Sequence, residues 1–197
     1  MLASVKFVGT TKHEKRYLTR GFIDGVLASL GVVIGASTAI GTTSDAAANA
    51  IIIAAGVGGG VANGLSNILG ASVGEKLVKE IELAEIEKAM LKKGGDLHGT
   101  AIDKHLNETL LSSALYDGLA TFVGSIIPVI PFIFGSFLFI SDMISLYLSI
   151  IISLILFFIL GLYIGKISRG QMILSGLKLV AFGIVTVIIT TFIRMIL

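Results

Sequence analysis

The sequence contains no cysteine, only two prolines and few charged side chains. Without cysteine the chain can form no disulfide, no thiolate metal site and no thiol nucleophile. Charged residues make up 14% of the chain and hydrophobic residues 54%, and the mean hydropathy is +0.95. This composition lies outside that of soluble proteins and within that of integral membrane proteins. The formal net charge of +2 is small and mixed in sign, so it predicts no nucleic-acid partner.

Long runs without charge have the length of membrane-spanning helices. Residues 46–74 contain no charged residue, whereas about 20 apolar residues cross the roughly 30 Å of hydrocarbon as a helix. The runs predict an all-α integral membrane protein with five transmembrane helices and a short charged cytoplasmic helical insert between the second and third helices. The expected spans are Gly21 to about Thr43, Ala46 to Gly74, about Leu110 to about Ile140, Met143 to Gly165, and Gln171 to Met195.

Charge divides the chain into four parts. We expect a basic cytoplasmic N-terminus over residues 1–20, two spans over 21–74, the acidic insert over 75–109 and three spans over 110–197. No proline separates the second span from the insert, so one helix is expected to continue from the membrane into water. The insert holds six lysines and eight acidic residues, which is typical of a solvated helical hairpin.

The distribution of basic residues predicts the orientation. The positive-inside rule places basic loops in the cytoplasm. Lys166 and Arg169 lie in one predicted inner turn, whereas the turns around Asp45 and Asp142 lack Lys and Arg. We therefore expect a cytoplasmic N-terminus, an outer C-terminus and, because the polar start does not resemble a secretory signal, residence in the cell membrane. The basic residues near the start are Lys6, Lys12, Lys15, Arg16 and Arg20.

A short motif occurs twice with the same spacing. Asp24-Gly25 followed by Gly31 recurs as Asp117-Gly118 followed by Gly124. Both copies begin spans that enter from the cytoplasm, which favours parallel repeats of the kind whose interface holds the substrate in transporters. Chance recurrence in a glycine-rich chain is the alternative.

Two carboxylates within the spans are the sharpest candidates for a site. A carboxylate at the centre of a membrane costs about 2.5 to 3.5 kcal/mol on insertion scales, so it usually faces a cavity, a partner or an ion. Asp24 is a candidate metal ligand and Asp117 a candidate for proton coupling. The alternative for Asp24 is a local ion pair with Arg20, one turn earlier.

Other polar groups in and beside the membrane have two interpretations each. Asn63 and Asn67 lie one turn apart on the second span, where amide groups either bind a hard cation or join neighbouring helices. Pro128 and Pro131 predict a break in the third span, because proline removes amide donors from a helix. Such a break is tolerated where the backbone is buried or lines a polar path.

The charged insert offers further carboxylates. Glu75, Glu82 and Glu85 share one helical face and could collect Fe²⁺, Mn²⁺ or Ca²⁺ through oxygen ligands. A solvated helix with i,i+4 charge pairs explains them without metal. A second possible cluster, which loop polarity explains equally well, comprises Asp96, His98, Asp103, His105 and Glu108.

Four stretches carry a resemblance to a known family. In this order they resemble the vacuolar iron transporter family over nearly the whole chain after residue 20. The resemblance implies a homodimer in lipid that moves Fe²⁺ or Mn²⁺ out of the cytosol, with proton exchange as the coupling and no permanently bound cofactor. The stretches are RGFIDGVLASLGVVIGAS, GVGGGVANGLSNILGASVGEKLVKEIELAE, GSIIPVIPF and LGLYIGKISRGQMILSGLKLVAFGIVTVIITTF.

The resemblance also implies roles for single residues. Asp24 matches the aspartate of the family's first-span DG motif, a metal ligand of the transport path, and Glu82 falls where the family's cytoplasmic metal-binding helices begin. On the second span, however, this chain has Ser66-Asn67 and Gly70-Ala71, where the family usually has serine-methionine and glycine-glutamate. A thioether and a carboxylate are therefore absent, and oxygen ligands alone discriminate poorly between Fe²⁺ and Mn²⁺.

The leading prediction is a divalent metal exporter that works by proton antiport and is not an enzyme. No intramembrane histidine, cysteine or activated nucleophile supports catalysis; Ser66, for example, has no histidine partner in the membrane. Two alternatives stay open at this point. One is an exporter of another small cationic solute, and the other is a membrane assembly protein that transports nothing.

Overall fold

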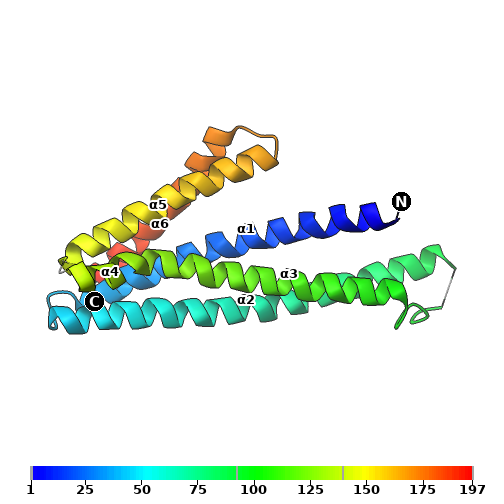
Figure 1. The fold of residues 1–197 in the computed structure, drawn as a ribbon, viewed down its shortest axis with the longest axis horizontal. Coiled ribbons are helices and arrows are strands. Elements are labelled where there is room, and N and C mark those ends of the chain that lie inside the picture. The colour runs from blue at the N-terminus through cyan, green and yellow to red at the C-terminus, as the bar shows by residue number, and fades with distance from the viewer. Residues whose placement is uncertain (1, 92, 139, 197) are drawn as a thin grey trace.

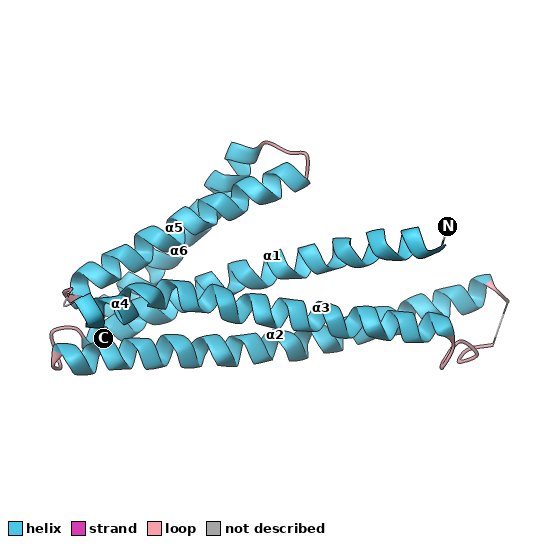
Figure 2. Cartoon of the chain, in the orientation of Figure 1, coloured by secondary structure: helices cyan, strands magenta, loops and turns pink. Residues whose placement is uncertain are grey.

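The computed structural model describes residues 2–91, 93–138 and 140–196, with side chains from Lys15 onward. Within these residues the chain is helical and contains no β-strand (Figure 2). The elements in order are α1 (Leu2–Ala36), the 3₁₀ turn η1 (Ser37–Ala39), α2 (Asp45–Ala89), α3 (Ala101–Ile126), the 3₁₀ turn η2 (Ile127–Val129), α4 (Ile130–Leu138), α5 (Asp142–Ile167) and α6 (Met172–Ile196).

Five helical segments in the described part of the chain are long and apolar enough to cross a membrane. They are Lys15–Ala39, Asp45–Ala89, Ala101–Leu138, Asp142–Ile167 and Met172–Ile196. The predicted fold class is therefore confirmed. The third segment combines α3, η2 and α4, and the predicted proline break is confirmed as the 3₁₀ turn at its middle.

The helices have two distinct ends (Figure 1). We call one the arm end, where α1 begins and where the hairpin between α2 and α3 projects. We call the other the distal end, where α1 ends, α2 begins and α4 meets α5. Because α1 and α3 both run from the arm end to the distal end, they are parallel, as the repeated motif predicts. The two termini lie at opposite ends (Figure 1).

The charged insert is the arm that projects beyond the bilayer. Helix α2 has 45 residues and is about 67 Å long at 1.5 Å per residue, whereas the hydrocarbon layer is about 30 Å thick. Its last turns and the first turns of α3 therefore lie outside the membrane. The expectation of one unbroken helix from the second span into the insert is confirmed.

A buried ion pair joins the two helices of the arm. Lys79 Nζ lies 2.6 Å from Asp103 Oδ1 and donates a hydrogen bond to Asn107 Oδ1 at 2.9 Å. The Gly99 N–H also donates to Asp103. The Lys79 hydrogen bond, followed by that of Gly99, lowers the pKa of the Asp103 carboxyl. The loop between the helices is held by Glu87, which accepts hydrogen bonds from nearby backbone N–H groups.

Glycines bring α1 and α3 into backbone contact in the membrane. A Cβ atom on Gly25 would lie 2.0 Å from the Thr121 carbonyl oxygen, and one on Gly124 would lie 2.5 Å from the Phe22 carbonyl oxygen. Any side chain larger than hydrogen would push these helices apart, so the close packing depends on glycine. Both glycines belong to the repeated motif, whose two copies thus face each other across one interface.

Helices α5 and α6 form a hairpin that joins the bundle mainly at the distal end. They pack through small residues, since a Cβ on Gly161 would lie 2.4 Å from the Gly176 Cα. At the distal end α5 contributes to the main core, which consists of Val26, Leu30, Val33, Ile34, Ile52, Val129, Phe132, Leu146 and Phe157. Toward the arm end the hairpin diverges from α1 (Figure 1).

Candidate functional site

Asp24 lies at the interface of the three bundle helices, where polar side chains from α1, α2 and α3 meet. The Asn67 amide nitrogen donates hydrogen bonds to Asp24 Oδ2 and to Thr121 Oγ1, both at 2.7 Å. Thr121 in turn donates to the carbonyl oxygen of Asp117, one turn earlier on α3. We call Asp24, Asn67, Asp117 and Thr121 the central cluster. Its members come from both copies of the repeated motif and from the helix between them.

Asp24 has no basic partner among the described residues, and this distinguishes it from Asp117. The predicted alternative of a local pair between Arg20 and Asp24 is not found in the described structure. Arg20 reaches across to α3 instead, where its guanidinium lies 3.8 Å from Asp117 Oδ2. The distance is long for an ion pair, and 57% of the Arg20 side chain is exposed. The contact is therefore loose.

Asp117 is fully buried, and its carboxylate oxygens accept no hydrogen bond from the described residues. A buried carboxylate without hydrogen bonds is costly as an anion. It is stabilised when it binds a proton or when a cation approaches. This placement is compatible with the predicted role in proton coupling, which stays a prediction.

A cavity of about 890 Å³ leads to Asp24. Residues of α1 form one wall and the last turns of α5 form another, while Asn67 contributes from α2. The cavity thus lies where the α5–α6 hairpin diverges from the bundle. Its lining residues are Lys15, Arg16, Thr19, Arg20, Ile23, Asp24, Leu27, Asn67, Ile164, Ile167 and Ser168.

Apolar packing lies on the distal side of this cavity. Val26, Leu30 and Val33 continue α1 beyond Asp24, and all three are fully buried in the main core. Phe132 and Phe157 fill the core from α4 and α5. The central cluster is therefore reached from the arm end through a cavity with charged residues in its wall, and apolar packing closes it toward the distal end.

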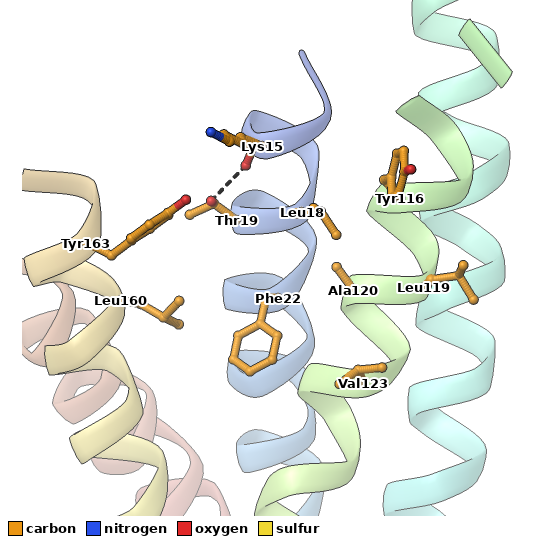
Figure 3. Close-up of a pocket in the computed structure, with 10 residues that line it drawn as sticks. All are labelled: Lys15, Leu18, Thr19, Phe22, Tyr116, Leu119, Ala120, Val123, Leu160 and Tyr163. Atoms are coloured by element: carbon orange, nitrogen blue, oxygen red, sulfur yellow. Dashed lines mark hydrogen bonds between the residues drawn. The ribbon is translucent and has the colours of Figure 1, made fainter. Parts of the chain in front are cut away.

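A second cavity, of about 440 Å³, lies against α1 and is almost wholly apolar. Figure 3 shows Leu160 and Tyr163 of α5 pointing across it toward Thr19 and Phe22 of α1, with α3 beside them. Thr19 lines both cavities. The hairpin thus leaves α1 loosely covered along its arm-end half.

The predicted metal ligands of the arm do not gather in the described structure. Glu75 is half-buried and accepts a hydrogen bond from the Tyr17 hydroxyl of α1. Glu82 and Glu85 are exposed farther along α2. Among the described residues no three His, Asp or Glu side chains lie close enough together to hold a metal ion. Metal binding by these three glutamates stays a prediction.

Three of the five residues in the second possible metal cluster of the arm, Asp96, His98 and Asp103, are engaged in structural contacts. Asp103 pairs with Lys79, Asp96 accepts a hydrogen bond from the Lys93 N–H, and His98 lies 3.6 Å from Glu80. These contacts tie the arm's two helices and loop together. Metal binding by the cluster stays a prediction.

The two asparagines of α2 are placed differently. Asn67 supports Asp24 through its amide nitrogen. Asn63, one turn earlier, is half-buried, and its amide nitrogen has no hydrogen-bond partner among the described residues. The structure thus brings Asp24, Asn67 and Asp117 into one region, and the role of both asparagines as metal ligands stays a prediction.

Sequence reasoning missed Thr121 and Tyr17. Thr121 lies four residues after Asp117, and the buried Tyr17 contacts Glu75 at the start of the arm. The spacing from Asp117 to Thr121 is one helical turn, and this was the signal that could have found the threonine. Nothing in the sequence pairs Tyr17 with a residue 58 positions away.

The fold and the buried carboxylates together define a multi-pass membrane protein with a polar site inside its helix bundle. A family model described as the VIT family matches residues 88–195. An uncharacterized protein of Methanocaldococcus jannaschii is 47% identical over 174 residues, which cover 88% of this chain and 85% of the relative. The chain belongs to the VIT family, the vacuolar iron transporter family.

Proposed function

We propose that this protein exports a divalent metal ion, Fe²⁺ or Mn²⁺, from the cytosol in exchange for protons. The family to which the chain belongs favours metal transport over catalysis. In this proposal the arm end faces the cytosol, as the basic residues near the start of the chain favour. The protein works as a homodimer in the cell membrane.

The observation that carries the proposal is the placement of Asp24. Its carboxylate borders a cavity within the membrane-spanning bundle, and no basic side chain pairs with it in the described structure. A carboxylate in that position attracts a cation. Asn67 orients the carboxylate by donating to Oδ2, and Asp24 is then the first ligand that an incoming ion meets inside the membrane.

The form described here is open toward the arm end and closed toward the distal end. Alternating access requires that the apolar barrier beyond Asp24 opens while the cavity closes. The α5–α6 hairpin is the element suited to this movement, because it packs on the bundle at the distal end and diverges from α1 around the cavity. The 3₁₀ turn at Pro128 lies where the hairpin meets the bundle.

The charges around the cavity shape how an ion enters. Lys15 and Arg16 line the cavity and repel a cation. Glu75 lies beside Tyr17, which immediately follows these residues on α1, and supplies negative charge at the same level. In our proposal Glu75, Glu82 and Glu85 bind the ion on the arm and pass it into the cavity beyond Lys15 and Arg16.

Proton exchange is assigned to Asp117. When Asp24 binds a divalent ion, the added positive charge favours loss of a proton from a neighbouring carboxyl group. Asp117 is on the neighbouring helix α3, and hydrogen bonds from Asn67 and Thr121 join Asp24 to its backbone carbonyl. Metal binding and proton release are then coupled electrostatically within one cluster.

The substrate class is tested with purified protein in liposomes whose lumen is acidic. We expect Mn²⁺ and Fe²⁺ to enter through molecules whose arm faces outward, faster with the pH gradient than without it. Mg²⁺ and methylammonium serve as competitors of different chemistry. Uptake of methylammonium that Mn²⁺ does not inhibit would contradict metal transport and favour a small amine as the substrate, and uptake of neither would favour an assembly role.

A further inference from the structure

A second group of polar side chains lies at the distal end, on the far side of the main core from Asp24. It comprises Asp45 and Asn49 at the start of α2, and Asp142 and Ser145 at the start of α5. We call these four residues the distal cluster. Three of its members are buried, and Asp45 is exposed. Helices α2, α4 and α5 contact one another there. The proposed transport function uses none of these residues.

Asp142 is buried in a way that its sequence position does not require. A carboxylate in the first turn of a helix is stabilised by the helix dipole even when it is exposed to water. Asp142 is nevertheless only 6% exposed, and its Oδ2 accepts no hydrogen bond from the described residues. The exposed carboxylate of Asp45 at the start of α2 repels it. No basic side chain pairs with either aspartate in the described structure.

Ser145 is a second, independent polar group that is buried at this end of α5. A serine within a helix commonly donates its hydroxyl to the carbonyl one turn earlier, as Ser153 does to Ser149 at 2.7 Å. The Ser145 hydroxyl is fully buried and has no partner among the described residues. It is directed at Gly135 of α4, where a Cβ atom would lie 2.6 Å from its oxygen.

Asn49 presents an amide oxygen to the same end of α4. Its nitrogen donates to the Phe132 carbonyl at 3.3 Å and to Ser136 Oγ at 2.8 Å. These bonds fix the amide plane. Asn49 is 7% exposed, and its Oδ1 has no partner among the described residues. Ser136 is adjacent to Gly135, so Asn49 and Ser145 approach the same segment of α4 from α2 and α5.

We propose that the distal cluster binds a hard divalent cation such as Mn²⁺ or Mg²⁺. Two carboxylates, an amide oxygen and a hydroxyl form an all-oxygen ligand set, which suits such ions, and water completes their coordination. The cation would neutralise the repulsion between Asp45 and Asp142 and satisfy the unpartnered oxygens. Cation binding at the distal cluster does not depend on the transport proposal. If the protein does transport metal, this site receives the ion after it has crossed the apolar barrier.

The absence of cysteine allows a clean local test. Ser141→Cys places one reactive thiol on an exposed position directly before Asp142. The rate at which a water-soluble maleimide labels this thiol is measured in detergent-solubilised protein as Mn²⁺ is titrated. We expect Mn²⁺ to slow the labelling, both in this variant and when Asp24→Asn is added.

Two further variants assign the effect to the cluster. Asp142→Asn, which keeps the size of the side chain, should abolish the protection, and Ser145→Ala should shift it to Mn²⁺ concentrations higher by roughly the 10- to 100-fold typical of altered metal sites. A separate Ser168→Cys variant serves as a control for folding, because its thiol lies at the arm end. Adding Asp142→Asn should leave the labelling rate of this thiol unchanged if the protein is folded. Labelling of Ser141→Cys that ignores Mn²⁺, or protection that survives Asp142→Asn, would overturn the proposal.

These outcomes are separate from those of the transport assay. If the protein moves no metal in liposomes but Mn²⁺ protects Ser141→Cys through Asp142, the distal site stands and the transport proposal fails. If metal transport is found without such protection, the distal site fails and the transport proposal stands.

Discussion

The two copies of the Asp-Gly motif have the same sequence and spacing but different surroundings. Asp24 on α1 borders the cavity, accepts a hydrogen bond from Asn67 and has no basic partner in the described structure. Asp117 on α3 is fully buried, accepts no hydrogen bond from the described residues and lies near Arg20. A repeated motif has therefore produced two chemically distinct carboxylates.

The difference arises from which helices cover each copy. The α5–α6 hairpin diverges from α1 near Asp24 and leaves the cavity open. Asp117 instead faces α1 itself, where Gly21 comes so close that a Cβ atom would lie 2.2 Å from the Asp117 carbonyl oxygen. The open carboxylate is suited to meet an ion, and the enclosed one is suited to hold or release a proton.

The largest expected effect comes from separating the two motif copies. Gly25→Ala places a methyl group 2.0 Å from the Thr121 carbonyl oxygen, so α1 must move away from α3. Overpacking of this kind costs roughly 1–3 kcal/mol, and the central cluster would lose its geometry. We expect a lower thermal unfolding midpoint in detergent and loss of transport.

Gly35→Ala is the matched control for that substitution. Gly35 lies on the same helix, and a Cβ atom there would meet nothing within 4 Å. Its unfolding midpoint should equal or slightly exceed that of the unmodified chain, because alanine is the better helix former. Equal stability of Gly25→Ala and Gly35→Ala would show that the close contact of the motif copies is not needed.

A smaller effect should follow from removing the support of Asp24 alone. Asn67→Ala deletes the hydrogen bonds to Asp24 and Thr121. Loss of a group that orients a ligand typically lowers metal affinity or activity by roughly 10- to 100-fold. Initial rates of Mn²⁺ uptake measure the change, and Ser66→Ala, at the exposed neighbouring position, should leave the rate unaltered. Full activity of Asn67→Ala would remove Asn67 from the site.

The smallest effect concerns the arm, away from both motif copies. The pKa of Asp103 is lowered by Lys79 and by the Gly99 N–H. Its contribution to arm stability is thus complete above the ordinary aspartate pKa of about 3.9 and is lost as the pH falls through the lower pKa of the folded arm. Pepsin digestion between about pH 5 and 2 should therefore cleave the arm faster at the acidic end of the range.

Asp103→Asn provides the comparison for this pH dependence. The variant should be cleaved faster than the unmodified chain near pH 5, and the difference should shrink as the pH falls. A constant difference between the two proteins would show that titration of Asp103 does not stabilise the arm.

The helices themselves could be predicted from the sequence. Uncharged runs predicted five spans, the lack of proline between the second span and the insert predicted one long helix, and Pro128 predicted the break in the third span. These features depend on local composition, because the bilayer selects helices by length and polarity. The parallel course of the two helices that carry the motif also followed from its recurrence.

The partners within the site could not be predicted in the same way. Arg20 lies one turn from Asp24, which favoured a local pair, yet its guanidinium approaches Asp117 on α3. Contacts between distant segments depend on how the helices pack, and here glycines bring α1 and α3 together. Asp142 was interpreted only as a turn residue, and the spacing of Ser145, Ser149 and Ser153 in an apolar helix was the signal that α5 has a buried polar face.

The most direct measurement compares the two aspartates in one assay. Mn²⁺ uptake into liposomes is measured with and without an acidic lumen for the unmodified protein, Asp24→Asn and Asp117→Asn, each shown by its unfolding midpoint to be folded. We expect Asp24→Asn to transport no Mn²⁺ under either condition, and Asp117→Asn to retain uptake that no longer responds to the pH gradient. Transport by Asp24→Asn at the rate of the unmodified protein would contradict the central claim that this carboxylate binds the ion.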